Sequence, residues 1–230
     1  SQFNPFDQGI EFIENKGQLA DMNGNQRPDL LFSGNSPFAK MYLKKDGLSY
    51  VVSKTEEGNR AIGGVRDNIE NPLSPNNPIP AVSSISLHRI DMDFVEANPK
   101  VKIKTDQRTQ GYYNYYLGYG NGLTHVYGYS RVIYEEMYKN IDVVYYGAKQ
   151  NGLKYDIVVK PGGDPNDIRM KYSGAEKISI VREDSFGENS VLRIETSLGK
   201  ITEIIPKVYQ KINGKIVEIG AKYVLDGSTV

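Results

Sequence analysis

Few side chains in this sequence have the chemistry of a general base or a nucleophile. The chain contains no cysteine and only two histidines, His88 and His125. Neither histidine lies in a metal-binding or nucleophile signature, and no phosphate-binding glycine loop is present. His88 starts an alternating segment and is interpreted as a structural residue. His125, in GLTHVYG, is interpreted as a loop or core residue rather than a general base.

A pair of carboxylates is the remaining arrangement that could support hydrolysis. Asp91 and Asp93 alternate with apolar residues in HRIDMDFV (88–95), which places both on one face of a strand, roughly 7 Å apart. That separation suits an inverting glycosidase. Alternating strands commonly carry such acids on their solvent face, so we interpret the pair as surface residues and expect no enzyme.

One loop has the oxygen-rich spacing of a calcium site. In DMNGNQRPD (21–29), Asp21, Asn23, Asn25 and Asp29 occupy offsets 1, 3, 5 and 9, as in loops that wrap calcium. The loop has only two carboxylates and lacks the bidentate acid that completes such sites. We therefore expect no cofactor and interpret the segment as a polar hairpin loop, with calcium as the alternative.

Tyrosines supply the other candidate site. The stretch TQGYYNYYLG (109–118) contains four of the chain's 17 tyrosines. Strand alternation puts Tyr113 and Tyr115 on one face and Tyr112 and Tyr116 on the other. Aromatic residues on both faces usually indicate a strand covered by a second layer, so we expect mainly core packing. Stacking on a ligand is the alternative for whichever face lies outward.

The overall composition narrows the class of protein. The 230 residues carry equal numbers of basic and acidic side chains, so no net field attracts nucleic acid. No apolar run is long enough for a membrane span, so we expect neither nucleic-acid binding nor membrane insertion. The absence of cysteine excludes disulfides and thiolate metal sites without identifying the compartment.

Short alternating segments separated by turn residues indicate the fold. Such segments occur at 41–52, 88–95, 153–159, 168–172, 191–196 and 200–205. Asp46-Gly47 and Asn213-Gly214 are typical hairpin turns, and only 131–140 could form a turn or two of helix. We expect a mainly β, antiparallel, β-sandwich-like fold with little helix, either as one unit or as two β subdomains.

A change in composition suggests the domain organisation. Residues 57–82 are rich in asparagine and proline and are expected to form a loop or linker. This divides the chain into an N-terminal β part (1–56) and a main β part (83–230), with one continuous domain over 1–230 as the alternative. Because the sequence stops just after a strand-like segment, we expect it to be part of a longer polypeptide.

Several strings of residues together resemble a known family. They are FIENKGQ (12–18), RPDLLF (27–32), KKDGLSYVV (44–52), YYLG (115–118), YKNIDVVYYG (138–147), GLKYDIVVKPGGDPNDIRMKYSGA (152–175) and IIPKVYQ (204–210). In this order they are similar to the conserved N-terminal module of large surface and secreted proteins of Bacteroidetes. Those proteins carry SBBP β-propeller repeats, PKD or other Ig-like domains, and C-terminal sorting domains for gliding motility and type IX secretion.

The resemblance implies an extracellular or outer-cell-surface location, with other domains of the same polypeptide as partners. The module is a domain of unknown function, so no catalytic residue can be transferred. Gly24, Arg27, Pro28 and Asp29 match the family's pattern, which favours a structural loop over calcium at 21–29.

We therefore expect a non-catalytic structural or adhesion module of a multidomain cell-surface or secreted bacterial protein. The alternative is a carbohydrate-binding module that uses exposed tyrosines. A surface glycan or a protein is the expected external partner.

Overall fold

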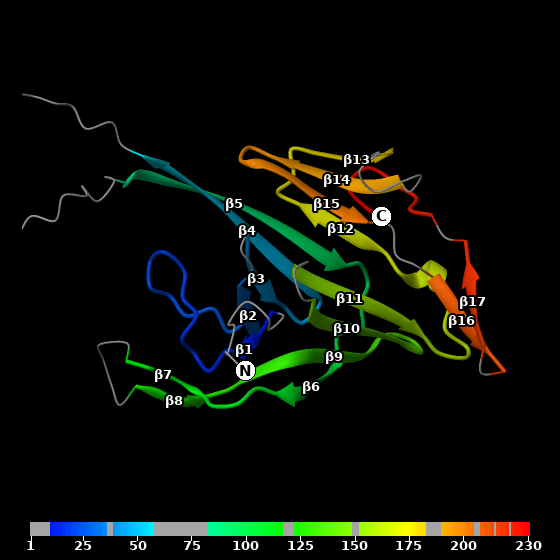
Figure 1. The fold of residues 1–230 in the computed structure, drawn as a ribbon, viewed down its shortest axis with the longest axis horizontal. Coiled ribbons are helices and arrows are strands. Elements are labelled where there is room, and N and C mark those ends of the chain that lie inside the picture. The colour runs from blue at the N-terminus through cyan, green and yellow to red at the C-terminus, as the bar shows by residue number, and fades with distance from the viewer. Residues whose placement is uncertain are drawn as a thin grey trace, which may run out of the picture.

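Strands form nearly all the regular structure (Figure 1). The computed structural model describes residues 10–35, 39–57, 82–116, 122–148, 152–182, 190–204, 208–213, 215–220 and 222–230. Every strand pairing in these ranges is antiparallel, which confirms the predicted fold class. No helix in the described ranges is long and apolar enough to cross a membrane.

A strongly curled ten-stranded sheet dominates the molecule, in the order β11-β10-β9-β1-β2-β3-β4-β5-β12, with β6 added beside β9 (Figure 1). Its strands are β1 (Phe12–Glu14), β2 (Phe32–Asn35), β3 (Ala39–Leu43), β4 (Gly47–Glu57), β5 (Val82–Phe94), β6 (Lys102–Arg108), β9 (Gly128–Tyr138), β10 (Ile141–Ala148), β11 (Gly152–Val159) and β12 (Met170–Ser173). Along β5, Ile90, Met92 and Phe94 point into the core and alternate with Asp91 and Asp93, as the sequence pattern predicts.

Three smaller sheets and one 3-10 turn complete the fold. They comprise β13 (Lys177–Arg182), β14 (Ser190–Thr196) and β15 (Gly199–Ile204); β16 (Val208–Ile212) and β17 (Lys215–Ile219); β7 (Tyr113–Tyr115) and β8 (Leu123–Val126); and η2 (Pro165–Asp167). The predicted hairpin at Asn213-Gly214 is confirmed by the pairing of β16 with β17, and Asn213 has the positive φ of 49° that such a turn uses.

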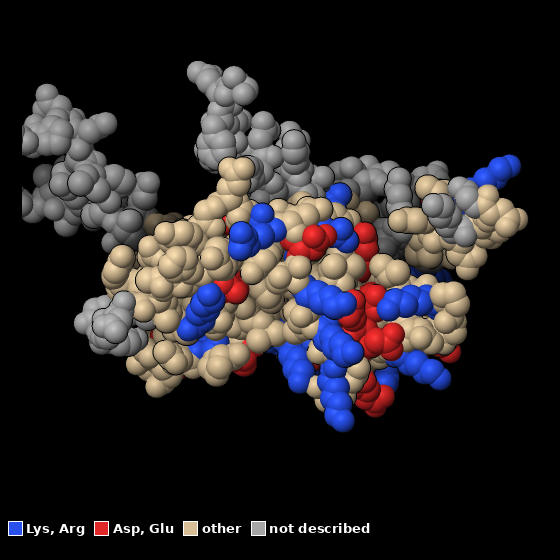
Figure 2. Space-filling model, turned by 90° about the horizontal axis from the view of Figure 1, so that it is seen from below, with Lys and Arg blue, Asp and Glu red and all other residues tan. Residues whose placement is uncertain are grey.

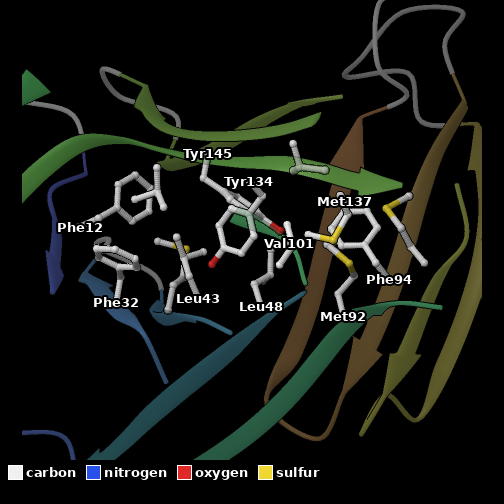
Figure 3. Packing of buried hydrophobic residues seen from close by; sticks show 14 of the residues in the cluster. Phe12, Phe32, Leu43, Leu48, Met92, Phe94, Val101, Tyr134, Met137 and Tyr145 are labelled. Atoms are coloured by element: carbon white, nitrogen blue, oxygen red, sulfur yellow. The ribbon is translucent and has the colours of Figure 1, made fainter. Parts of the chain in front are cut away.

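The core lies between the inner face of the curled sheet and the β13–β15 sheet. Leu192 and Ile194 of β14 are fully buried in the same apolar cluster as Leu48 of β4. Near its centre, the rings of Tyr134 and Tyr145 meet edge to face with centroids 5.3 Å apart (Figure 3). This packing of a small sheet against the large one gives the domain its sandwich-like character.

Strands from both sides of residues 57–82 belong to the curled sheet. β1 lies between β2 and β9, and β4 pairs with β5 along its whole length. Apart from Glu57 and Val82, which end β4 and begin β5, the predicted loop or linker lies outside the described residues.

The turn or two of helix that 131–140 could have formed is absent, because this segment forms most of β9. β9 pairs with β10 along one edge and with β6 along the other, so backbone hydrogen bonds to two neighbours replace those of a helix. Glu136 has φ 59°, at an irregularity in the pairing with β10. Tertiary pairing therefore outweighs the weak local tendency toward helix.

Candidate functional site

The tyrosine-rich stretch forms an arm at the edge of the molecule. The pairing of β6 with β9 ends where the Thr109 N–H donates to the Gly128 carbonyl at 2.9 Å. Beyond this point β7 and β8 form a separate hairpin, the β7–β8 arm, at the lower left of Figure 1. The pairing shifts between Tyr113↔Val126 and Tyr115↔Leu123, and His125, with φ 56°, lies in the bulge.

One face of the arm presents aromatic rings to solvent. The Tyr112 ring stacks on the His125 imidazole, with centroids 4.4 Å apart and planes at 29°. The Tyr127 ring meets Tyr112 edge to face at 6.4 Å. Alternation along β7 puts Tyr116 on this side, and Tyr112 and Tyr116 are 52% and 81% exposed. We call these four residues the tyrosine face.

The opposite face anchors the arm to the rest of the protein. The Tyr113 hydroxyl donates to Glu11 Oε2 at 2.6 Å, and the Thr109 hydroxyl donates to the other oxygen of the same carboxylate. The hydrogen bond to Glu11 raises the pKa of Tyr113 to about 12, and partial burial adds to the shift. Tyr115 lies beside Tyr113 at 6.5 Å and is half-buried.

The expectation that this stretch is mainly core is therefore wrong. Tyr112, Tyr113 and Tyr116 are all exposed, and among the paired residues of the arm Val126 is the one fully buried. The physical reason is that the β7–β8 hairpin extends past the edge of the curled sheet, so no other strand among the described residues covers its outer face (Figure 1). Sequence alternation correctly separated the two faces but contained no information on what lies against them.

Two cations border the tyrosine face. The Arg108 guanidinium carbon lies 4.6 Å from the centroid of the Tyr127 ring, and Lys16 Nζ lies 5.4 Å from it. Lys16 also donates to the His125 carbonyl at 2.8 Å and pairs with Glu14 at 3.1 Å. In the view from below, charged groups of both signs crowd around β6 and the far end of β9, whereas the end formed by β7 and β8 is largely uncharged (Figure 2).

The two aspartates of β5 do not form an acid–base pair. Lys44 Nζ bridges them, at 3.5 Å from Asp91 and in direct contact with Asp93. Burial acts to raise the pKa of Asp91, but hydrogen bonds from Arg89 and Ser49 and the charge of Lys44 hold it below its ordinary value. Glycoside hydrolysis needs one carboxyl with a raised pKa to donate a proton, so this ion-pair network does not match that chemistry.

Surface hollows of about 490 and 400 Å³ also lack a recognisable catalytic arrangement. The larger one is lined by Glu96, whose carboxylate pairs with Arg169, and by the exposed Asp167. The smaller one is lined by Tyr146, whose hydroxyl donates to Asp156 at 2.9 Å.

In the candidate calcium loop, the carboxylate oxygens of both aspartates accept hydrogen bonds from groups of the loop itself. Asp21 Oδ1 accepts the backbone N–H groups of Asn23 at 2.9 Å and Asn25 at 2.8 Å, and Oδ2 accepts the Asn25 amide at 3.0 Å. Asp29 forms a two-pronged pair with Arg27, at 2.8 and 2.6 Å. Within the described ranges, no three acidic or histidine side chains converge as metal ligands. Asp21 and Asp29 thus lie in separate hydrogen-bonded groups, and calcium binding at this loop stays the untested alternative to the polar-loop interpretation.

A buried carboxyl group that the sequence did not reveal joins both edges of the curled sheet. Glu203 Oε2 of β15 accepts hydroxyls from Tyr155 of β11 at 3.2 Å and Tyr172 of β12 at 3.0 Å. Burial raises the pKa of Glu203, and the two hydroxyls lower it in part. Its Oε1 is enclosed without a hydrogen-bond partner among the described residues. Glu203 thus connects β11 and β12, the two end strands of the curled sheet, and we call these three residues the Glu203 clasp.

His88 has the structural role that the sequence indicated, whereas His125 is an exposed residue of strand β8 and lies in neither a loop nor the core. His88 Nδ1 lies 2.8 Å from the Ser197 hydroxyl and Nε2 lies 2.7 Å from the Gly174 carbonyl, so both ring nitrogens are used in joining two turns. His125 lies in the arm and stacks on Tyr112. Tyr127, which sequence reasoning passed over, is two residues after His125, and strand alternation could have placed the two on one face.

These features define an antiparallel β domain with a curled main sheet and an exposed aromatic arm. A family model matches residues 12–230, and the chain belongs to that family, which is described as Domain of unknown function (DUF7948). No curated protein and no solved structure matched the chain.

Proposed function

We propose that this domain is a non-catalytic adhesion module of a multidomain cell-surface or secreted bacterial protein. The resemblance of its motifs to the N-terminal module of Bacteroidetes surface proteins supports an extracellular or outer-surface location. It also supports covalently linked neighbours such as SBBP repeats, Ig-like domains and a type IX secretion or gliding-motility sorting domain. The pairing of Asp91 and Asp93 with Lys44 supports a role other than catalysis.

The tyrosine face is the contact surface in this proposal, and its ligand is a carbohydrate. Tyr112 is held by its stack on His125 and by the edge of Tyr127, so little conformational entropy is lost when a ligand covers it. A sugar ring presents an apolar face that packs on such a ring while its hydroxyls remain available to polar tips. Tyr112 and Tyr116 are separated by roughly 13 Å of strand, which is long enough for an oligosaccharide.

An array that carries glycans and extracellular proteins tests this function. The wild-type domain is compared with the double variant Tyr112→Ala/Tyr116→Ala and with Tyr209→Ala, a control whose tyrosine is 61% exposed on β16. We expect wild type and the control to bind the same subset of glycans and the double variant to lose that binding. Binding only to proteins would contradict the carbohydrate ligand, and an unchanged signal from the double variant would contradict the tyrosine face.

A further inference from the structure

Arg108 has no acidic partner in the described parts of the chain, whereas three basic side chains near it do. Arg131 lies 3.5 Å from Asp106, Lys104 lies 2.6 Å from Glu135 and Lys16 lies 3.1 Å from Glu14. Arg108 is exposed at the end of β6, and its guanidinium packs on the Tyr127 ring instead. The whole chain has equal numbers of acidic and basic residues, so a partnerless arginine is not a consequence of excess positive charge.

The packing of Arg108 on Tyr127 makes it suitable for receiving an anion. Contact with an aromatic face holds the guanidinium, and the N–H groups around the rim of its plane remain free to donate. A carboxylate matches two of these donors at once, which gives both charge attraction and a fixed orientation. Because the side chain is already positioned by the ring, less entropy is lost on binding than for a free surface arginine.

Arg108 is also adjacent to the aromatic rings that would hold a sugar. The Tyr127 ring lies between the two groups, since it contacts Arg108 at 4.6 Å and the edge of Tyr112 at 6.4 Å. Lys16 Nζ adds a second positive charge 5.4 Å from the centroid of the same ring. One ligand unit can therefore stack near Tyr112 while an acidic substituent on it or on the next unit reaches Arg108.

We propose that the tyrosine face selects glycans that contain uronic acid, with Arg108 binding the sugar carboxylate. This inference rests on the proposed carbohydrate-binding function and specifies its ligand class. A nucleic acid does not fit, because phosphate backbones require a longer stripe of basic residues than Arg108 and Lys16 provide. A sulfate ester can also accept two hydrogen bonds from a guanidinium, so a sulfated glycan is included in the test to separate the two kinds of acid.

The test compares ligands that differ only in the acid. Isothermal titration calorimetry uses oligogalacturonate, alginate and hyaluronate oligosaccharides, the fully methyl-esterified form of each, and a carrageenan oligosaccharide, which carries sulfate esters but no uronic acid. We expect at least one uronate to bind about tenfold more tightly than the methyl ester, as the loss of a charge-assisted pair implies. We expect Arg108→Gln to abolish that difference and Arg108→Lys to keep part of it. Arg182→Gln, at the exposed end of β13, should behave as wild type.

The possible results separate this inference from the proposed function. Equal binding of uronate and ester, or a difference that survives in Arg108→Gln, would overturn the uronate inference and leave carbohydrate binding intact. Preference for the sulfated carrageenan oligosaccharide over every uronate would also overturn it. If none of these glycans bind and the array shows no glycan signal, both proposals fail. Unchanged thermal unfolding of the Arg108 variants shows that any loss of affinity is local.

Discussion

The ring of Tyr112 lies 4.4 Å from the imidazole of His125, and the two planes are within 29° of parallel. This stack depends on the bulge in β8, where the positive φ of His125 directs its side chain to the side of the arm that carries Tyr112. One face of Tyr112 is thereby covered, and the residue still has 52% of its surface exposed. A ring supported from behind in this way is suited to receive a flat ligand, and the proposed function depends on it.

The pH dependence of stability should reveal the Glu203 clasp. Burial raises the pKa of Glu203 above its ordinary value of 4.5, so the folded protein holds this proton over a pH range in which the unfolded chain releases it. The contribution of Glu203 to stability must therefore fall as pH rises above 4.5 and become constant above the folded pKa. Urea unfolding of wild type and Glu203→Gln should show that the variant gains stability relative to wild type between pH 5 and pH 8.

Glu218→Gln, on the exposed strand β17, serves as the control for this comparison, because its difference from wild type should be the same at both pH values. A Glu203→Gln variant that loses relative stability at high pH would show that the ionised carboxylate, rather than the neutral acid, holds Tyr155 and Tyr172.

Truncation of a core leucine should distinguish the buried and exposed faces of the β4–β5 ribbon. Leu48 in β4 is fully buried, and Leu48→Ala is expected to reduce the free energy of unfolding by about 2–5 kcal/mol through lost burial and a cavity. Leu87 in β5 is 57% exposed, so Leu87→Ala should change the free energy of unfolding by less than about 0.5 kcal/mol. Equal losses in the two variants, measured by urea unfolding, would mean that the sheet is covered on both faces there.

Close backbone approach should make Gly47 intolerant of a side chain. A Cβ at this position would lie 2.1 Å from the Met92 carbonyl oxygen and 2.9 Å from the Asp93 Cα. We expect Gly47→Ala to destabilise the protein by about 1–3 kcal/mol or more, because β4 must move away from β5. Gly220→Ala is the matched control, since no heavy atom lies within 4 Å of the added carbon. A Gly47→Ala melting temperature equal to that of wild type would be inconsistent with this packing.

The loop at 21–29 should not respond to calcium. Both oxygens of Asp21 already accept hydrogen bonds from Asn23 or Asn25, and Asp29 pairs with Arg27. We therefore expect the same melting temperature in EDTA and in millimolar calcium. A calcium-dependent rise that disappears in Asp21→Asn would show binding to the folded state and would restore the calcium hypothesis.

Much of the fold could be predicted from local patterns, because buried and exposed side chains alternate along a half-buried strand. Ile90, Met92 and Phe94 illustrate this, as does the hairpin around Asn213. The alternation could not reveal which strands pair over long distances. β1 between β2 and β9, and Glu203 between β11 and β12, depend on the curl of the whole sheet. Residues 131–140 form a strand instead of a turn of helix for the same reason, because they pair with the distant strands β6 and β10.

The candidate site was predictable only in part. The alternation of TQGYYNYYLG separated Tyr112 from Tyr113 and Tyr115, and the structure shows Tyr112 stacked on His125 while Tyr113 and Tyr115 lie together beside Glu11. Exposure could not be predicted, because it depends on the arm extending past the edge of the curled sheet. Arg108 and Lys16 were missed because they come from β6 and from the turn after β1, and only the tertiary fold brings them to Tyr127.

Nuclear magnetic resonance of protein labelled with carbon-13 in its tyrosine rings tests the central claim most directly. The labelled domain is titrated with the oligosaccharide that binds best on the array, and resonances are assigned from single tyrosine-to-phenylalanine variants. The tyrosine-face account predicts that the signals of Tyr112, Tyr116 and Tyr127 shift with ligand while that of the exposed Tyr209 stays unchanged. Unchanged signals from Tyr112 and Tyr116 at saturating ligand, or shifts confined to Tyr209, would contradict it.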